Sequence, residues 1–185
     1  AEDSWIGWHN DSGFLTALAG EIYVDHDTGE VLDPASSDDV DPLAGLYVVT
    51  RSGGPPVRVE IPKDCLAVQI GECTQIVTGG SVIATPHCVR GSRPGAGKGG
   101  GGRRRRIARI SCPCFVDTPP SFPLHVPAGT SHEAVLTAGV GHDRVPPLGE
   151  RWTEDGMTFG DFLGVTFARY YDWSVGKKVE REEGM

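Results

Sequence analysis

The chain has 185 residues, of which 38% are hydrophobic and 23% charged, a composition typical of one globular domain with its own core. Its formal net charge of −8 makes nucleic acid and anionic membrane surfaces poor partners for the molecule as a whole. No apolar run approaches the roughly 20 residues that a membrane-spanning helix needs, and no signal peptide is visible.

The first predicted element is an apolar, strand-like run at residues 5–20, "WIGWHNDSGFLTALAG", which carries His9 and Asp11. Residues i and i+2 of a strand point to the same face, so the imidazole and the carboxylate should project together. Both groups can bind a metal, and a third ligand then has to come from a distant part of the chain. The chain opens on "AEDSW" without a methionine, and we expect the first part of the domain to precede it.

Short strand-like segments recur through the first two thirds of the chain. They are predicted at residues 45–50 ("GLYVVT"), 57–61 ("VRVEI"), 65–71 ("CLAVQIG"), 82–85 ("VIAT") and 107–116 ("IARISCPCFV"). The sequence "RSGGPP" at residues 51–56 favours a hairpin turn between the first two of these. Many short strands separated by Gly and Pro turns predict a mainly β fold, a sandwich or a barrel, over residues 1–120.

Two segments within residues 1–120 have the composition of insertions. Residues 25–42 are acidic and turn-rich without core periodicity, and residues 91–106, "GSRPGAGKGGGGRRRR", form a low-complexity Gly/Arg-rich segment. The run Arg103–Arg106 could contact nucleic acid, but no aromatic residues accompany it and the rest of the chain is acidic, which favours a solvated loop.

The end of the chain changes character. Residues 121–150 are predicted to be a Pro/Gly-rich connector, and residues 151–185 a helical segment that packs on the outside of the β core. Helical spacing relates Phe159, Phe162, Leu163, Thr166 and Tyr170. Thr158, followed three residues later by Asp161, predicts a capping box at the start of this helix.

His87 is the best candidate for the third ligand, because it follows the apolar segment 82–85. Two neutral imidazoles and one carboxylate on one face of a metal are typical of non-haem iron sites, which leave the opposite positions open for oxygen and a cosubstrate. Considered alone, His87 is better explained as a hydrogen-bonded histidine at a strand end.

Arg109 and Ser111 are again related as i and i+2 on a predicted strand. A guanidinium offers two parallel hydrogen bonds to a carboxylate, and a neighbouring hydroxyl can add a third. The alternative is an exposed surface arginine that happens to lie beside a serine.

Four motifs in this order resemble the 2-oxoglutarate and Fe(II)-dependent oxygenases, and more narrowly their isopenicillin N synthase-like, plant-type branch. They are "HNDSGFLTAL" (9–18), "LAVQIGECTQIVTGG" (66–80), "RISCPCFVDTPP" (109–120) and "VPPLGERWTEDGMTFGDFLGVTFARYY" (145–171). The resemblance covers most of residues 5–120 together with 145–173. His87 and Arg109 lie further apart than is usual in the family, and an insertion at 91–106 would account for the excess.

The resemblance implies a double-stranded β-helix, or jelly-roll, core with a C-terminal helix. Carried over by position, His9, Asp11 and His87 would bind Fe(II), and Arg109 and Ser111 would hold the distal carboxylate of the cosubstrate 2-oxoglutarate. The implied reaction uses O2 to hydroxylate or demethylate a small organic substrate and releases succinate and CO2. The alternative is a non-catalytic binding or scaffold relative that keeps the fold, inactive as a truncated chain.

Other candidate groups in the sequence have simpler interpretations. His26 and Asp27 are adjacent and should point in opposite directions, which argues against a shared metal. Cys112-Pro-Cys114 could indicate zinc, but without a second pair at zinc-finger spacing, buried thiols in a strand are favoured. Five cysteines form no disulfide framework, so we expect a reducing compartment and a cytoplasmic location. Surface or packing roles are expected for His125, His132 and His142.

Overall fold

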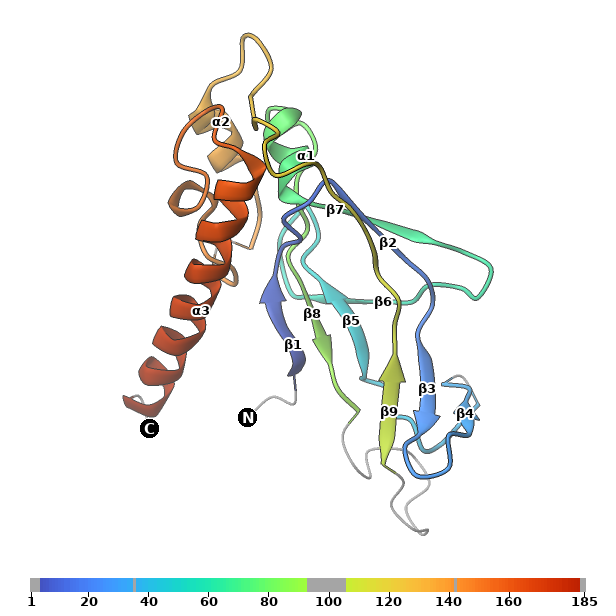
Figure 1. The fold of residues 1–185 in the computed structure, drawn as a ribbon. Coiled ribbons are helices and arrows are strands. Elements are labelled where there is room, and N and C mark those ends of the chain that lie inside the picture. Colours follow the sequence, from blue (N-terminus) through green and yellow to red (C-terminus); the bar gives the residue numbers. More distant parts are fainter. Residues whose placement is uncertain (1–3, 35, 93–105, 142, 184–185) are drawn as a thin grey trace.

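The fold was determined as a computed structural model, which describes residues 4–34, 36–92, 106–141 and 143–183. Its elements follow one another along the chain as strands first and helices last, with one short helix between strands (Figure 1). The strands are β1 (Ser4–His9), β2 (Leu15–Leu18), β3 (Ile22–Asp25), β4 (Val31–Leu32), β5 (Gly45–Val48), β6 (Val57–Val59), β7 (Ala67–Ile70), β8 (His87–Arg90), β9 (Ile107–Ile110) and β10 (Cys114–Val116). The helices are α1 (Glu72–Val77), α2 (His132–Thr137), the 3-10 helix η1 (Leu148–Glu150) and α3 (Phe159–Glu183).

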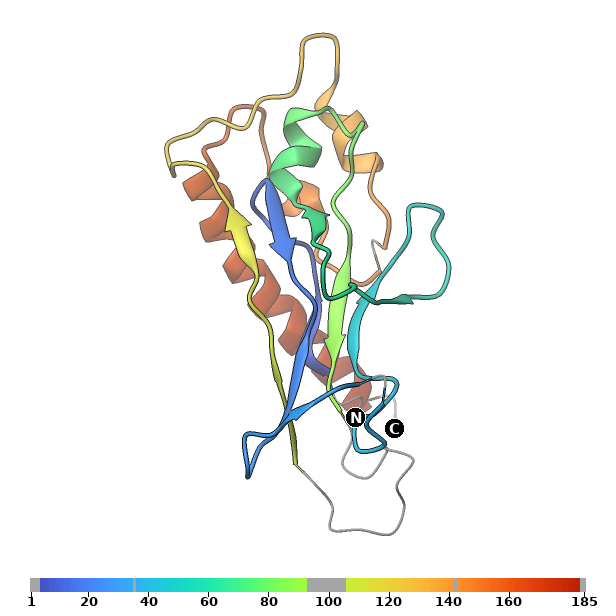
Figure 2. The same cartoon turned by 90° about the vertical axis from the view of Figure 1, so that its right-hand side faces the viewer.

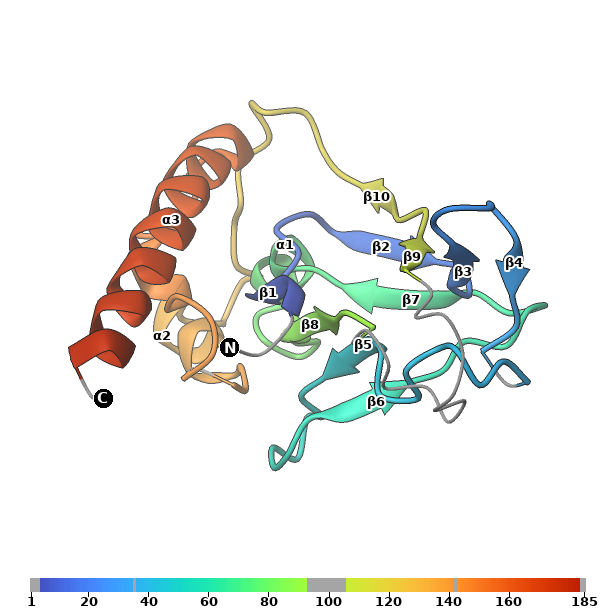
Figure 3. The same ribbon diagram turned by 90° about the horizontal axis from the view of Figure 1, so that it is seen from below.

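The strands form two facing layers of antiparallel sheet (Figure 3). One layer has the order β1-β8-β5-β6. The other combines the sheet β10-β2-β7 with the sheet β4-β3-β9, because β2 leads directly into β3 and β9 directly into β10. The prediction of a mainly β, jelly-roll type fold with a C-terminal helix is confirmed.

The segment predicted as one strand at residues 107–116 is in fact two. Ala17 pairs with Cys114 and Ile22 with Ile110, so four residues intervene on one side of the ladder and three on the other. The pairing register therefore shifts by one residue at 111–113. Pro113, which has no backbone N–H to donate to the ladder, lies in this break.

The strand predicted at residues 82–85 is wrong in position, since β8 begins only at His87. The Ala84 N–H, which a strand would use in a ladder, donates instead to the side-chain Oε1 of Gln75 at 2.8 Å. Pro86, the residue just before the strand, has no backbone N–H to donate to a ladder. As a result His87 is the first residue of its strand.

The predicted hairpin at residues 45–61 is confirmed, with β5 and β6 paired antiparallel. Its turn contains Gly53 and Gly54 at φ values of 73° and 91°, a left-handed conformation that strains residues with a Cβ. Residues 25–42, expected to be an acidic insertion, contribute β4 and a small second core in which Leu32 and Val40 pack on Tyr23. Of the predicted Gly/Arg-rich segment, residues 93–105 lie outside the described ranges.

The main apolar core lies among the helices and not between the two sheets. Helices α1 and α2 and the start of α3 gather at one end of the β layers, and α3 then runs along the side of the layers where β1 lies (Figures 1 and 2). Their core cluster comprises Cys73, Ile76, Leu124, Val135, Leu148, Trp152, Phe159 and Phe162. The space between the sheets holds a pocket that is lined by both apolar and polar side chains.

The predicted C-terminal helix is confirmed as α3. Phe159, Phe162 and Thr166, three of the residues predicted to share its packing face, are 3%, 0% and 2% exposed. The N-cap half of the predicted capping box is present, because the Thr158 Oγ1 accepts from the Asp161 N–H at 3.2 Å; the Asp161 carboxylate accepts from the Thr158 hydroxyl at 2.6 Å. None of the described helices combines the length and apolar character required to cross a bilayer.

Candidate metal centre

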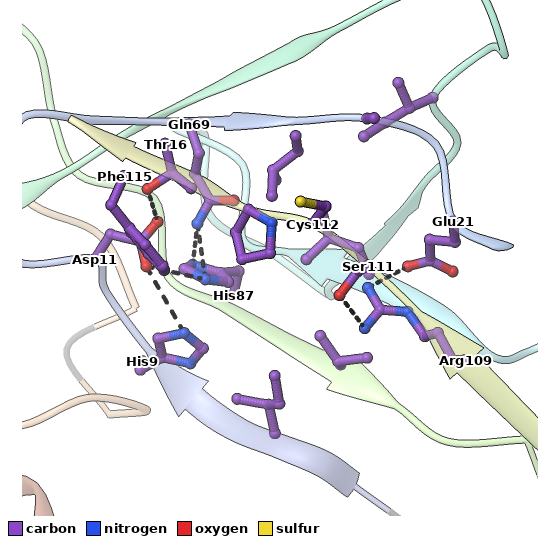
Figure 4. A pocket seen from close by; sticks show the side chains of 17 residues that line it. His9, Asp11, Thr16, Glu21, Gln69, His87, Arg109, Ser111, Cys112 and Phe115 are labelled. Atoms are coloured by element: carbon purple, nitrogen blue, oxygen red, sulfur yellow. Dashed lines mark hydrogen bonds and ion pairs between the residues drawn. The ribbon is translucent and has the colours of Figure 1, made fainter.

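His9, Asp11 and His87 converge between the sheets at one end of the pocket (Figure 4). β1 and β8 are paired so that His9 lies opposite His87, and the two ring centroids are 4.0 Å apart. Asp11 follows the end of β1, so it does not share a strand face with His9 as the sequence predicted. Its Oδ1 nevertheless lies 3.9 Å from Nε2 of His9 and 3.7 Å from Nε2 of His87.

Backbone carbonyls set the protonation of both imidazoles. Nδ1 of His9 lies 2.8 Å from the Gly7 carbonyl oxygen, and Nδ1 of His87 lies 2.9 Å from that of Thr85. A carbonyl oxygen can only accept, so each Nδ1 carries the proton and each Nε2 keeps its lone pair. Both lone pairs are thereby available at the atoms that face Asp11, which is how metal-binding histidines are usually oriented.

The carboxylate of Asp11 is held from the protein side. The buried Thr16 hydroxyl donates to its Oδ2 at 2.6 Å, which leaves Oδ1 toward the histidines. The loop that carries it is pressed against the start of α1, because a Cβ on Gly71 would lie only 2.1 Å from the Gly13 carbonyl oxygen. A glycine is needed at position 71 for this approach, which fixes the position of the ligand loop.

His87 is buried and remains neutral at ordinary pH. Burial and repulsion from His9 lower its pKa to about 4, against the opposing influence of Asp11 and the Thr85 carbonyl. The contact between His87 and Asp11 is therefore not an ion pair at neutral pH. A neutral imidazole is the form that binds a metal.

We expect the metal-free protein to lose stability as the pH falls from about 6.5 toward 4. In that window His87 binds a proton in the unfolded chain, where its pKa is 6.5, but not in the folded chain, where its pKa is about 4. The loss from this group should approach ~3 kcal/mol at the acidic end, and no change from it is expected above pH 7. Urea unfolding of wild type and His87→Gln over this range measures it, because the variant should lack this part of the pH dependence. Parallel pH profiles for the two proteins would contradict the expectation.

Gln69, on β7, is a site residue that the sequence analysis missed. Its amide nitrogen lies 2.8 Å from Nε2 of His87, and its side chain is buried between the layers. A metal can bind at Nε2 of His87 only if the Gln69 amide moves away from the lone pair of that atom. The sequence feature that could have identified Gln69 is its position as a polar residue within an apolar strand. In the structure it pairs in register with Thr16, a second buried polar residue.

Arg109 and Ser111 lie at the other end of the same pocket, which encloses about 100 Å³ (Figure 4). Arg109 is not an exposed surface arginine, since its side chain is only 11% exposed. Its Nη1 donates to the Ser111 hydroxyl at 3.2 Å. The two residues therefore act together despite the break in the strand, and they share one pocket with the histidines.

Glu21 also lines this end of the pocket and was not predicted. Nη2 of Arg109 donates to Oε1 of Glu21 at 2.7 Å, and the Tyr23 hydroxyl donates to Oε2 at 2.5 Å. The Nε of Arg109 is buried and has no hydrogen-bond partner. Arg109 is therefore charge-paired within the protein and keeps an unused donor.

A buried ion pair is hydrogen-bonded to the loop between His9 and Asp11. Arg151 holds both carboxylate oxygens of Glu72 at 2.5 Å, and the side chains are 0% and 1% exposed. Burial opposes the charge of Arg151, but Glu72 outweighs it and raises the pKa of the guanidinium. Asn10, between two of the ligands, donates its amide to Glu72 and its backbone N–H to the Tyr170 hydroxyl, both at 2.9 Å. Helix α3 is thereby connected to the loop between His9 and Asp11.

The competing candidates do not form sites in the part of the chain that the structure describes. His26 and Asp27 are exposed in the turn after β3, where Asp27 pairs with Arg106. His125 pairs with Asp155 at the surface and His132 stacks on Trp152, while His142 lies outside the described residues. The cluster of His9, Asp11 and His87 is the one group of potential metal ligands found among the described residues.

The cysteines correct one expectation. Cys112 and Cys114 are exposed, and not buried in a strand as predicted. Cys112 lies in the break between β9 and β10, and Cys114 begins β10, an edge strand whose three residues are all exposed. All five cysteines lie within the described ranges and none forms a disulfide. Burial raises the pKa of Cys73 to about 12, so this thiol remains protonated.

The donor set fits ferrous iron. One nitrogen of each imidazole and one carboxylate oxygen lie within 4.8 Å of one another, as a 2-His-1-carboxylate site requires. Gly7, Thr85 and Thr16 orient the three side chains. The chain therefore presents a ligand set that needs only the displacement of the Gln69 amide.

No protein-family model matches the chain, and no curated protein matches it in sequence. Three solved structures have a similar backbone arrangement. The first is a Caulobacter crescentus protein provisionally assigned to the 2OG-Fe(II) oxygenase family, with 22% sequence identity and a TM-score of 0.48. The others are the dioxygenase for auxin oxidation 1 of Arabidopsis thaliana in a binary complex with 2-oxoglutarate (20% identity, TM-score 0.45) and a full-length Neurospora crassa protein in complex with α-KG (14% identity, TM-score 0.48). The matches cover 85%, 71% and 86% of this chain and 38%, 38% and 36% of those proteins. The chain thus spans little more than a third of their length, and these values do not by themselves assign it a family or a reaction.

Proposed function

We propose that the protein is a 2-oxoglutarate- and Fe(II)-dependent dioxygenase that oxidises a small organic substrate, by hydroxylation or demethylation, and releases succinate and CO2. The observation that carries this proposal is the presence of two complementary groups in one pocket: a 2-His-1-carboxylate set at one end and the Arg109–Ser111 pair at the other. A dicarboxylic 2-oxo acid has one end that chelates a metal and another that pairs with a guanidinium.

Each residue would have a separate task. His9, Asp11 and His87 would hold Fe(II), which supplies the activation of O2 when it is bound. Arg109 and Ser111 would bind the distal carboxylate of 2-oxoglutarate and thereby direct its oxo acid end to the metal. The apolar walls, from Leu18, Leu46 and Val89, would limit the access of water.

Arg109→Gln is expected to raise the Kd for 2-oxoglutarate at least about 30-fold, because a charge-assisted carboxylate contact is worth roughly 2 kcal/mol or more. The Kd is measured anaerobically with Fe(II), from the visible charge-transfer band that a chelated 2-oxo acid gives. The affinity for Fe(II) alone should not change. An unaltered Kd for 2-oxoglutarate would remove the reason to name this cosubstrate.

Succinate formation from 2-oxoglutarate in the presence of Fe(II) and O2 tests the proposed reaction directly. Arg169→Gln is a matched control for a lost guanidinium, since Arg169 pairs with Glu150 at the surface of α3 and does not line the pocket. Absence of succinate, with the iron and the cosubstrate both bound, would contradict the proposed turnover.

A non-catalytic binding protein is the second candidate. The observation in its favour is that the polar groups of the pocket also satisfy one another: Gln69 contacts Nε2 of His87, and Glu21 pairs with Arg109. A protein of this kind would bind small molecules in the pocket without consuming 2-oxoglutarate. Measured succinate formation separates the two candidates.

A further inference from the structure

We propose that Glu21 sets the selectivity of the Arg109 end of the pocket by weakening the binding of carboxylates there, that of 2-oxoglutarate included, without abolishing it. The inference rests on the proposed function only in taking Arg109 as the group that meets the distal end of the ligand. Without Glu21, a ligand would meet the uncompensated positive charge of Arg109. With Glu21, it meets an ion pair of zero net charge that still has hydrogen-bond donors.

The geometry of the pair supports this role. Oε1 of Glu21 lies 2.7 Å from Nη2 of Arg109, and the two side chains are 17% and 11% exposed. Both side chains line the pocket, on the opposite side from Asp11 and the histidines (Figure 4). At this burial the two charges are poorly screened by water, so each strongly alters the potential that a ligand meets.

Glu21 is fixed in place. The Tyr23 hydroxyl donates to its Oε2 at 2.5 Å, and Tyr23 itself is 1% exposed in the small second core. Gly45, at the start of β5, leaves the space that the carboxylate fills, because a Cβ there would lie 3.3 Å from the same Oε2. The neighbouring Arg58 is engaged by Glu60 and by the Ala44 carbonyl. A ligand therefore meets Glu21 beside Arg109 and cannot simply displace it.

The hydrogen bonds of Arg109 show what remains for a ligand. Nη2 donates to Glu21 and Nη1 to Ser111, while Nε is buried without a partner. Each Nη nitrogen carries a second N–H that can still donate to a ligand oxygen, but a second carboxylate beside Glu21 adds like-charge repulsion. Glu21 thus weakens anionic ligands more than neutral polar ones.

Glu21→Gln is the decisive variant, since the amide keeps the shape and an acceptor for Arg109 while removing the charge. The probe is glutarate with the metal-free protein, because this dicarboxylate lacks the oxo group and reports on the anchor alone. We expect glutarate to bind at least about tenfold more tightly to Glu21→Gln than to wild type in titration calorimetry or NMR titration. Its neutral diamide, glutaramide, should change by less than about threefold.

Two further variants complete the test. Glu133→Gln removes an exposed charge on α2 and should leave the Kd for glutarate within about twofold of wild type. Adding Arg109→Gln to Glu21→Gln should abolish the gain. Unchanged or weaker binding of glutarate to Glu21→Gln, no detectable binding to either protein, or a gain that survives Arg109→Gln would each overturn the proposal.

This test is separate from that of the oxygenase reaction. Tighter glutarate binding to Glu21→Gln supports the role of Glu21 even if the protein forms no succinate. Conversely, succinate formation by wild type with no tightening in Glu21→Gln would leave the reaction in place and overturn the role of Glu21.

Discussion

Asp11→Asn is expected to raise the Kd of the protein for ferrous iron by at least about 100-fold, because Asp11 is the one anionic member of the ligand set. Changes in residues that merely orient metal ligands already cost about 10–100-fold, and the loss of a ligand charge should cost no less. The variant keeps the size of the side chain and an oxygen that can accept from Thr16, so the fold should persist. Anaerobic titration with Fe(II) measures the affinity.

A thermal unfolding series adds a second measurement. Iron at about 100 times the wild-type Kd should stabilise wild type by about 2.7 kcal/mol, and Asp11→Asn at the same concentration by no more than about 0.4 kcal/mol. Asp64→Asn, an exposed aspartate in the loop before β7, is the matched control and should bind iron like wild type. Equal iron affinity in Asp11→Asn and wild type would show that the three side chains do not form the metal site.

Arg151→Leu is expected to lower the free energy of unfolding by about 3–5 kcal/mol, because it leaves the carboxylate of Glu72 buried without its cation. The same change frees Glu72 from its position beside Asn10, so the loop between His9 and Asp11 should become less ordered. We therefore also expect weaker iron binding, by roughly tenfold. Urea unfolding and Fe(II) titration measure the two effects.

Arg169→Leu provides the control for the lost guanidinium. Arg169 pairs with Glu150 at 4.0 Å, but the side chains are 49% and 51% exposed, so water screens the contact and the cost should remain below about 1 kcal/mol. Tyr170→Phe tests the position of the loop between His9 and Asp11 separately from the stability of the protein, since it removes only the hydroxyl that accepts from the Asn10 N–H. Equal losses of stability in Arg151→Leu and Arg169→Leu would contradict the importance of the buried pair.

Several features could be predicted from neighbouring residues alone, because local chemistry determines them. The Gly-rich turn at 51–56 had to form a hairpin, and Thr158 with Asp161 had to begin a helix whose packing face includes Phe162. Where the backbone had a local reason to stop hydrogen bonding, the predictions were less accurate. Pro86 delayed β8 to His87, and Pro113 divided the strand that carries Arg109.

The sequence by itself determined which chemical groups are present and in which order: two histidines and an aspartate for a metal, and an arginine beside a serine for a carboxylate. The tertiary structure alone decided what surrounds them. Pairing of β1 with β8 brought His9 against His87, and the packing of β3 on β9 brought Glu21 against Arg109. Gln69 and Glu72 likewise reach the site only through contacts distant in the chain. Such contacts depend on strand register and burial, which arise from the packing of the whole chain and leave no signal in the spacing of neighbouring residues.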